Sequence, residues 1–184
     1  MNKYLAGCIL AMLVGAGSAG AVPPVSIDQH ADVPWSSLSS NPFDGKLVYD
    51  KHFDDHFAFV TMWSRSGIKA TYTSYWRERV GWRYVWRTRH VWVDGKRVEE
   101  RYRDREDIYE RRTSQRIPKA LMFAIHGKIY RYESGEVPPD LAQALATAPP
   151  GNMIIRVVWD NDQTWDTPIG EGTVATWRAV FSSP

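Results

Sequence analysis

Aromatic and basic residues alternate along residues 76–107, which read WRERVGWRYVWRTRHVWVDGKRVEERYRDRED. A period of two is typical of a β-strand, because successive side chains point to opposite faces. Asp94-Gly95 lies in the middle of this stretch. Both central positions of a type I′ turn need a positive φ angle, which Asp and Gly adopt at low cost. The pattern therefore predicts a long β-hairpin over about 76–107, closed by a two-residue turn.

The remaining pattern predicts short strands and two or three short helices. Residues 68–78, 128–133 and 153–159 are rich in β-branched or aromatic residues and favour strands. Three segments favour helices: 118–127, which begins with Pro and ends with Gly, 139–147 and 173–181. Residues 47–63 and 107–116 fit either a helix or a strand. Together these elements predict an α+β fold, with a mostly antiparallel twisted sheet and the helices packed on one side.

The first 21 residues resemble a secretory signal peptide. Lys3 precedes an apolar run over 5–16, and Ala19-Gly20-Ala21 fits the cleavage rule of small residues. The apolar run is shorter than the about 20 residues that a membrane span needs. Residues 22–46 are rich in Pro and Ser and predict a flexible leader, followed by a single domain over 47–184. We expect an exported protein, periplasmic or extracellular, whose mature chain lacks cysteine because Cys8 is the only one.

The charge of the chain is nearly balanced overall but uneven along its length. Lys and Arg number 23 and Asp and Glu 21, which gives a net charge of +2. Residues 77–116 contain 12 Arg and one Lys against eight acidic residues, so this region is basic. Such asymmetry attracts anionic polymers or lipid headgroups, whereas the small net charge and the expected export argue against a nucleic-acid binder.

Pairing the two strands across Asp94-Gly95 predicts the contacts of the hairpin. On one face Trp and Tyr lie opposite Arg, and on the other Arg83 faces Glu106 and Arg89 faces Glu100. Directly opposed side chains lie about 5 Å apart at Cβ, which is close enough for a guanidinium to contact a ring. A bulge near Gly81 or Glu99-Glu100 would shift this register. The candidate ligand-binding residues are Trp82, Tyr84, Trp86, Trp92, Arg101, Arg103 and Arg105.

Two interpretations of this face are open. Rings and guanidinium groups suit sugar rings, peptidoglycan, another envelope polymer or a membrane surface. Alternatively, the face is a structural ladder that ends under the predicted helices over 118–126 and 139–147, since Trp more often builds a core than a ligand site. The leading hypothesis is a non-catalytic exported protein, without a cofactor, that binds an envelope polymer, a partner protein or an anionic surface. A further hypothesis is an assembly subunit that pairs by strand addition.

A hydrolase or metal-dependent enzyme is the alternative from another class. His52 and His56 would share one face of a helix at a spacing that zinc sites use, and Asp55 or Asp54 would complete the site or orient an imidazole. The chain lacks the Glu that follows the first His in zinc proteases, and it has no Gly-x-Ser-x-Gly elbow or phosphate-binding loop. His126, at the end of a predicted helix, would stabilise the helix dipole.

Overall fold

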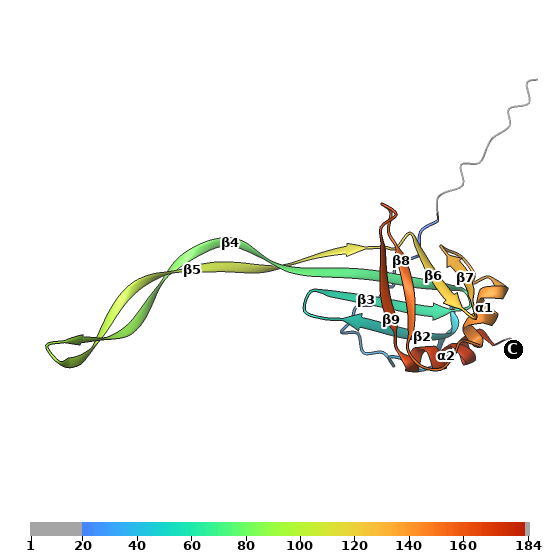
Figure 1. Ribbon diagram of the computed structural model, residues 1–184, viewed down its shortest axis with the longest axis horizontal. Coiled ribbons are helices and arrows are strands. Elements are labelled where there is room, and N and C mark those ends of the chain that lie inside the picture. The colour runs from blue at the N-terminus through green and yellow to red at the C-terminus, as the bar shows by residue number, and fades with distance from the viewer. Residues whose placement is uncertain (1–19, 183–184) are drawn as a thin grey trace, which may run out of the picture.

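The computed structural model describes residues 20–182. The predicted signal peptide, apart from Gly20 and Ala21, therefore lies outside the described residues. Figure 1 shows the described elements, in chain order. They are β1 (Ser39–Asn41), β2 (Gly45–Phe53), β3 (Phe57–Ser64), β4 (Gly67–Val93), β5 (Lys96–Arg116), β6 (Ala120–Ile125), β7 (Lys128–Tyr132), α1 (Pro139–Ala146), β8 (Met153–Val158), β9 (Thr164–Ile169) and α2 (Glu171–Phe181).

The strands form two antiparallel sheets. One has five strands in the order β1-β2-β3-β4-β5, and the other has four in the order β7-β6-β8-β9. The strands of the smaller sheet run across those of the larger one, and both helices lie at the end of the domain opposite the projecting hairpin (Figure 1). The prediction of mostly antiparallel β structure with helices and a long hairpin is thus confirmed, but the strands form two sheets where the sequence predicts one. No helix within residues 20–182 has the length and apolar character needed to cross a membrane.

The main core lies between the two sheets and the helices. Trp63 of β3 is fully buried, and its ring centroid lies 4.7 Å from that of Trp177 in α2 and 5.9 Å from that of Phe123 in β6. The core joins both sheets because alternate residues of each strand point inward. Its other members include Val48, Phe59, Ile68, Leu121, Leu141, Leu145, Ile155, Val157, Ile169, Val174 and Phe181.

The N-terminal segment differs from the predicted flexible leader over 22–46. Val22 is fully buried and its backbone N–H donates to the carbonyl oxygen of Pro118 at 3.0 Å. Val25 packs with Val60 and Met62 in a second apolar cluster on the larger sheet. β1 and the first residues of β2 also lie within 22–46. The apolar residues on either side of Pro23-Pro24 therefore hold this segment against the domain.

The segment predicted as a helix over 118–127 is a hairpin. Residues 120–125 form β6, and His126 and Gly127 have φ angles of 52° and 75°, as a type I′ turn requires. His126 therefore ends no helix of its own, although its Nε2 lies 2.9 Å from the carbonyl oxygen of Thr147, at the C-terminal end of α1. The other two predicted helices are present as α1 and α2.

Candidate binding surface on the hairpin arm

β4 and β5 extend far beyond the larger sheet. β3 pairs with β4 only as far as Ser74, and beyond that residue β4 pairs with β5 alone. We call residues 75–113 the arm. At about 3.3 Å per residue, its strands span roughly 60 Å. The arm projects from the domain as a twisted two-stranded ribbon (Figure 1), so both of its faces meet solvent.

The turn and register of the arm agree with the sequence. Asp94 and Gly95 have φ angles of 48° and 73°, which fit the predicted type I′ turn. Val93 pairs with Lys96, and every predicted pair is present down to Trp82 and Asp107. The hairpin is longer than predicted, because residues 107–116 continue as strand.

A β-bulge between Arg79 and Gly81 determines which side chains share a face. Arg79 pairs with Tyr109 and Gly81 with Ile108, so Val80 is an extra residue in β4. One extra residue reverses the alternation of faces. Tyr75 lies before the bulge and Trp82 after it, and they share a face. We call this the aromatic face.

Contacts with β5 support this assignment. Arg111 lies over the ring of Tyr75 at 4.3 Å, and Arg105 lies over the ring of Trp82 at 4.8 Å. Both arginines have odd numbers in a strand without a bulge, so they lie on the same face. The aromatic face is therefore continuous across the bulge.

Guanidinium groups on the aromatic face stack on rings diagonally across the strands. Arg103 lies 4.2 Å from the ring centroid of Tyr84, and Arg101 lies 5.7 Å from that of Trp86. The sequence instead predicts contact between direct partners, such as Trp86 and Arg103, which are indeed opposed at Cα. Strand twist brings diagonal neighbours together, which explains why the observed contacts differ from the predicted ones.

The rings of the aromatic face are exposed. The exposed fractions are 46% for Trp82, 56% for Tyr84, 63% for Trp86 and 74% for Trp92. The alternative interpretation, in which the hairpin ends under predicted helices over 118–126 and 139–147, is therefore wrong. Residues 120–125 form a strand, and the arm points away from α1 (Figure 1). All seven candidate ligand-binding residues lie on this exposed face.

The opposite face of the arm neutralises its own charge. Arg83 lies 2.7 Å from Glu106, Arg89 lies 2.8 Å from Glu100, and Arg87 lies 2.9 Å from Asp104. The first two pairs confirm the predicted contacts. Because solvent screens these exposed pairs, each contributes little to stability.

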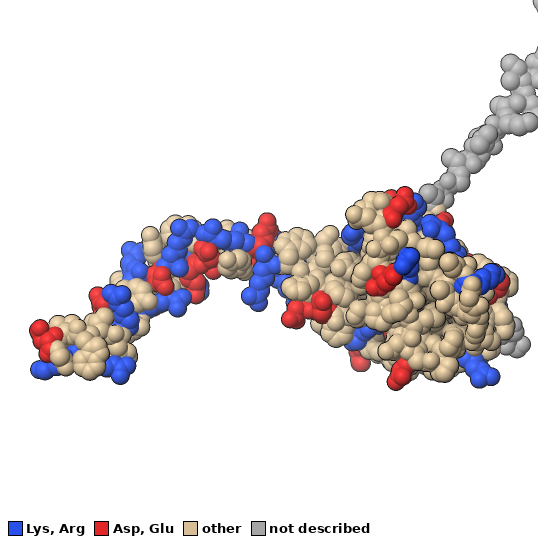
Figure 2. Space-filling model, viewed as in Figure 1, with Lys and Arg blue, Asp and Glu red and all other residues tan. Residues whose placement is uncertain are grey.

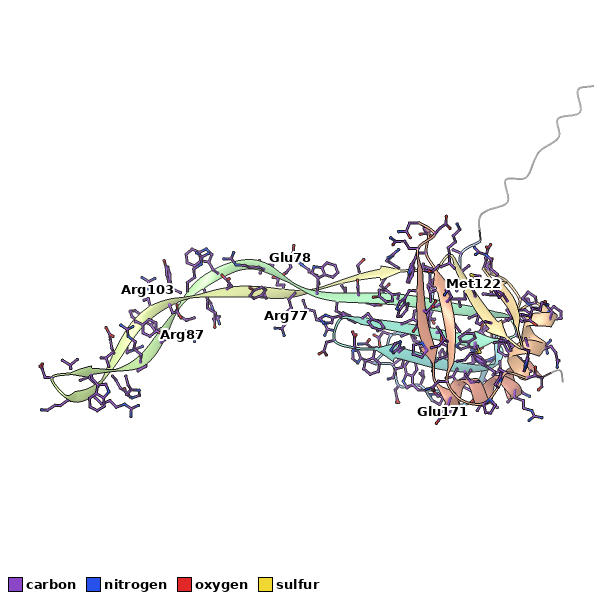
Figure 3. The ribbon with its side chains drawn as sticks, viewed as in Figure 1. Arg77, Glu78, Arg87, Arg103, Met122 and Glu171 are labelled. Carbon is purple, nitrogen blue, oxygen red and sulfur yellow. The ribbon has the colours of Figure 1, made fainter. Side chains whose placement is uncertain are left out.

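The aromatic face keeps its positive charge. Within residues 20–182, Arg97, Arg101 and Arg103 have no carboxylate oxygen within 4 Å. Arg105 lies 3.9 Å from Asp107, but that carboxylate lies 2.7 Å from Arg79. Figure 2 shows basic side chains along the arm with fewer acidic ones between them, and Figure 3 labels Arg87 and Arg103, which belong to opposite faces.

The predicted metal ligands do not form a site of the expected kind. His52 lies in β2, where its Nδ1 is 2.8 Å from Thr167 Oγ1, while Asp55 and His56 lie in the exposed turn before β3. Within residues 20–182 no group of three or more His, Cys, Asp or Glu side chains could hold a metal ion. The helical spacing on which the metal hypothesis depends is wrong, because this segment is a strand followed by a turn.

Asp50, within β2, and Asp54, in this turn, have opposite pKa shifts. Asp50 is 5% exposed, and burial raises its pKa despite hydrogen bonds from Thr173 and Ser36 and from the backbone of Gly170. Asp54 is fully exposed, and hydrogen bonds from the backbone N–H groups of His56 and Phe57 lower its pKa. Asp50 therefore contributes stability that is present at low pH and is lost as pH rises through its folded-state pKa. Asp54 contributes stability that is lost as pH falls.

We expect the variants Asp50→Asn and Asp54→Asn to change the pH dependence of stability in opposite directions. As pH rises from about 4 to 7, the unfolding free energy of Asp50→Asn should increase relative to that of the native chain, because the amide avoids burial of a charge. That of Asp54→Asn should decrease relative to that of the native chain as pH rises from about 2 to 5, because the native carboxylate strengthens its hydrogen bonds as it ionises. Urea unfolding at a series of pH values measures both, and parallel pH profiles for the two variants would contradict the assignment.

Comparisons with protein-family models, with curated proteins and with solved structures found no match to this chain.

Proposed function

We propose that this protein is an exported cell-envelope protein that binds an extended anionic polymer along the aromatic face of its arm. One observation supports the proposal above all. Arg101 and Arg103 lie over exposed rings and, within the described residues, have no carboxylate within 4 Å. Arg105 stacks in the same way and shares its nearest carboxylate with Arg79.

Stacking prepares these guanidinium groups for an anion. A ring beneath the guanidinium plane restricts its motion and leaves N–H groups at its edge for an incoming oxygen pair. A charge-assisted bidentate contact is among the stronger hydrogen-bonded pairs in proteins. Because the arginines already occupy one side of these rings, anionic groups are better ligands here than stacked sugar rings.

The spacing of the arginines favours a polymer over a small ligand. Arg101, Arg103 and Arg105 alternate along β5, so successive side chains on this face are about 6.6 Å apart along the strand. A single exposed ion pair is worth no more than about 1 kcal/mol. Several contacts to one chain act together, because each later contact is intramolecular. A polymer with repeated negative charges therefore gains affinity that one anion does not.

The combined variant Arg101→Gln, Arg103→Gln, Arg105→Gln tests this function. We expect its affinity for poly-L-glutamate at low salt to fall about 100-fold, on the basis of about 1 kcal/mol for each lost contact. The melting temperature should change by only about 2 °C, because the three side chains lie outside the core. Titration calorimetry and circular dichroism measure the two quantities.

The matched control replaces three arginines on the opposite face, Arg83, Arg87 and Arg89, by Gln. Both triple variants lose the same net charge, but the control removes arginines that already face carboxylates. We expect the control to retain most of the affinity. An equal loss in both variants would show that only net charge matters, and absence of binding by the native chain would overturn the proposed function itself.

A further inference from the structure

A like-charge pair lies on the aromatic face where the arm leaves the domain. Arg77 and Arg111 are direct partners in the ladder of β4 and β5. Like charges directly opposed on one face are destabilising. Within residues 20–182, neither guanidinium has a carboxylate oxygen within 4 Å. The repulsion between them is therefore not compensated by an ion pair.

The next pair along the ladder, on the opposite face, is a like-charge pair whose repulsion is compensated. Glu78 and Glu110 are also direct partners. Arg112 lies 2.8 Å from Glu78 and 3.1 Å from Glu110, so its guanidinium bridges the two carboxylates and reduces the repulsion between them. Figure 3 labels Arg77 and Glu78, adjacent residues that belong to opposite faces of the ribbon. Glu78 and Glu110 thus pair with Arg112, and neither is a counterion for Arg77 or Arg111.

The two arginines line a cavity beside the domain. Its volume is about 570 Å³. Arg111 is held over the ring of Tyr75 at 4.3 Å. The turn before β3 forms the other side, and Asp54 Oδ1 fixes this turn by accepting the backbone N–H of His56 at 2.6 Å. The lining residues are Asp55, His56, Tyr75, Trp76, Arg77 and Arg111.

We propose that this cavity binds a phosphate group. Two guanidinium groups that line one cavity favour a ligand with several acceptor oxygens and more than one negative charge. A phosphate monoester or the free ion supplies three or more oxygens and a charge of about −1.5 to −2 at pH 7, whereas a carboxylate supplies two oxygens and one charge. Asp55 also lines the cavity, and the two guanidinium groups outnumber this single carboxylate. His56 also lines the cavity, and its imidazole is able to donate or accept a hydrogen bond.

The variant Arg77→Gln tests the phosphate site with two measurements. In titrations with inorganic phosphate at constant ionic strength, adjusted with sodium chloride, we expect binding at least about tenfold weaker than for the native chain. Without phosphate, the melting temperature should stay the same or rise, because one of two repelling charges is gone. A purely structural role for Arg77 predicts the reverse, a lower melting temperature with unchanged phosphate binding. Arg111→Gln is the second variant, with the same expected loss of binding.

Arg112→Gln is the matched control on the opposite face. This variant should bind phosphate as tightly as the native chain does. Its melting temperature should be lower, since Glu78 and Glu110 lose their shared partner. Glucose 1-phosphate is the second probe: tighter binding than the free ion indicates an organic phosphate, and equal binding indicates the ion alone.

The triple variant of Arg101, Arg103 and Arg105 separates this site from the proposed polymer surface. Its affinity for poly-L-glutamate should fall, whereas its affinity for phosphate should equal that of the native chain. If the native chain binds phosphate no more tightly than Arg77→Gln does, the phosphate site is overturned, whatever the outcome with the polymer.

Discussion

Removal of residues 84–93 and 96–105 is expected to leave the domain folded and to abolish the binding of anionic polymers. The deletion joins Arg83 to Asp94-Gly95 and Gly95 to Glu106. Arg83 and Glu106 are already direct partners, so the same turn closes the shortened hairpin. Ten residues leave each strand, and an even number preserves the alternation of faces. The deletion removes six of the seven candidate ligand-binding residues and spares only Trp82.

The melting temperature of the shortened protein should lie within about 3 °C of the native value, because the deleted residues belong to neither apolar core cluster. Its affinity for poly-L-glutamate should fall by about 100-fold or more, since the multivalent contacts are lost. Circular dichroism and calorimetry measure these results. Retained affinity would place the polymer site on the domain, and a large loss of stability would show that the distal arm supports the fold.

The distal hairpin could be predicted because its determinants are local. Asp94-Gly95 specifies the turn, and the turn fixes each later pair as far as the bulge. Twist is a property of the paired strands and is not encoded in the spacing, so the diagonal contact of Arg103 with Tyr84 could not be derived from direct opposition.

Two elements were not predicted because much of what determines them lies far away along the chain. Residues 120–125 have a composition that fits a helix, and His126-Gly127, which joins β6 to β7, is a weaker turn signal than Asp-Gly. The other edge of β6 pairs with β8, whose nearest residue lies more than 25 positions further along the chain. The segment after Ala21 has the Pro and Ser content of a linker, yet Val22 and Val25 fill spaces that the sheets create. In both cases tertiary contacts override local propensity.

The cavity at the base of the arm was not predicted, because its residues come together only through the bulge and the tertiary fold. Up to the bulge, pairing from the turn continues correctly, but one extra residue in β4 changes every pair beyond it. Only after this shift does Arg77 lie opposite Arg111. Gly81 was a signal for the bulge, since glycine within a strand often marks one. The contribution of His56 and Asp55 depends on the fold of β2 and β3 and has no local signal.

The largest loss of stability is expected from Trp63→Ala. The Trp63 side chain is fully buried and packs against Phe123 and Trp177, so one ring joins the two sheets and α2. Its Nε1 also donates a hydrogen bond to Thr61 Oγ1 at 2.7 Å. Truncation of a buried aromatic residue to Ala costs about 3–5 kcal/mol, which is a large part of the about 5–15 kcal/mol that stabilises a typical domain.

This loss corresponds to a decrease of about 10 °C or more in melting temperature. Trp63→Phe should cost less, because a ring remains between Phe123 and Trp177. Trp86→Ala, on the exposed arm, is the matched control and should change stability by less than about 1 kcal/mol. Urea unfolding of the three variants tests the order. A similar loss of stability for Trp63→Ala and Trp86→Ala would contradict a core joined through Trp63. A large difference would show that Trp63 stabilises the fold, whereas Trp86, whose ring contacts Arg101 on the exposed arm, contributes little to it.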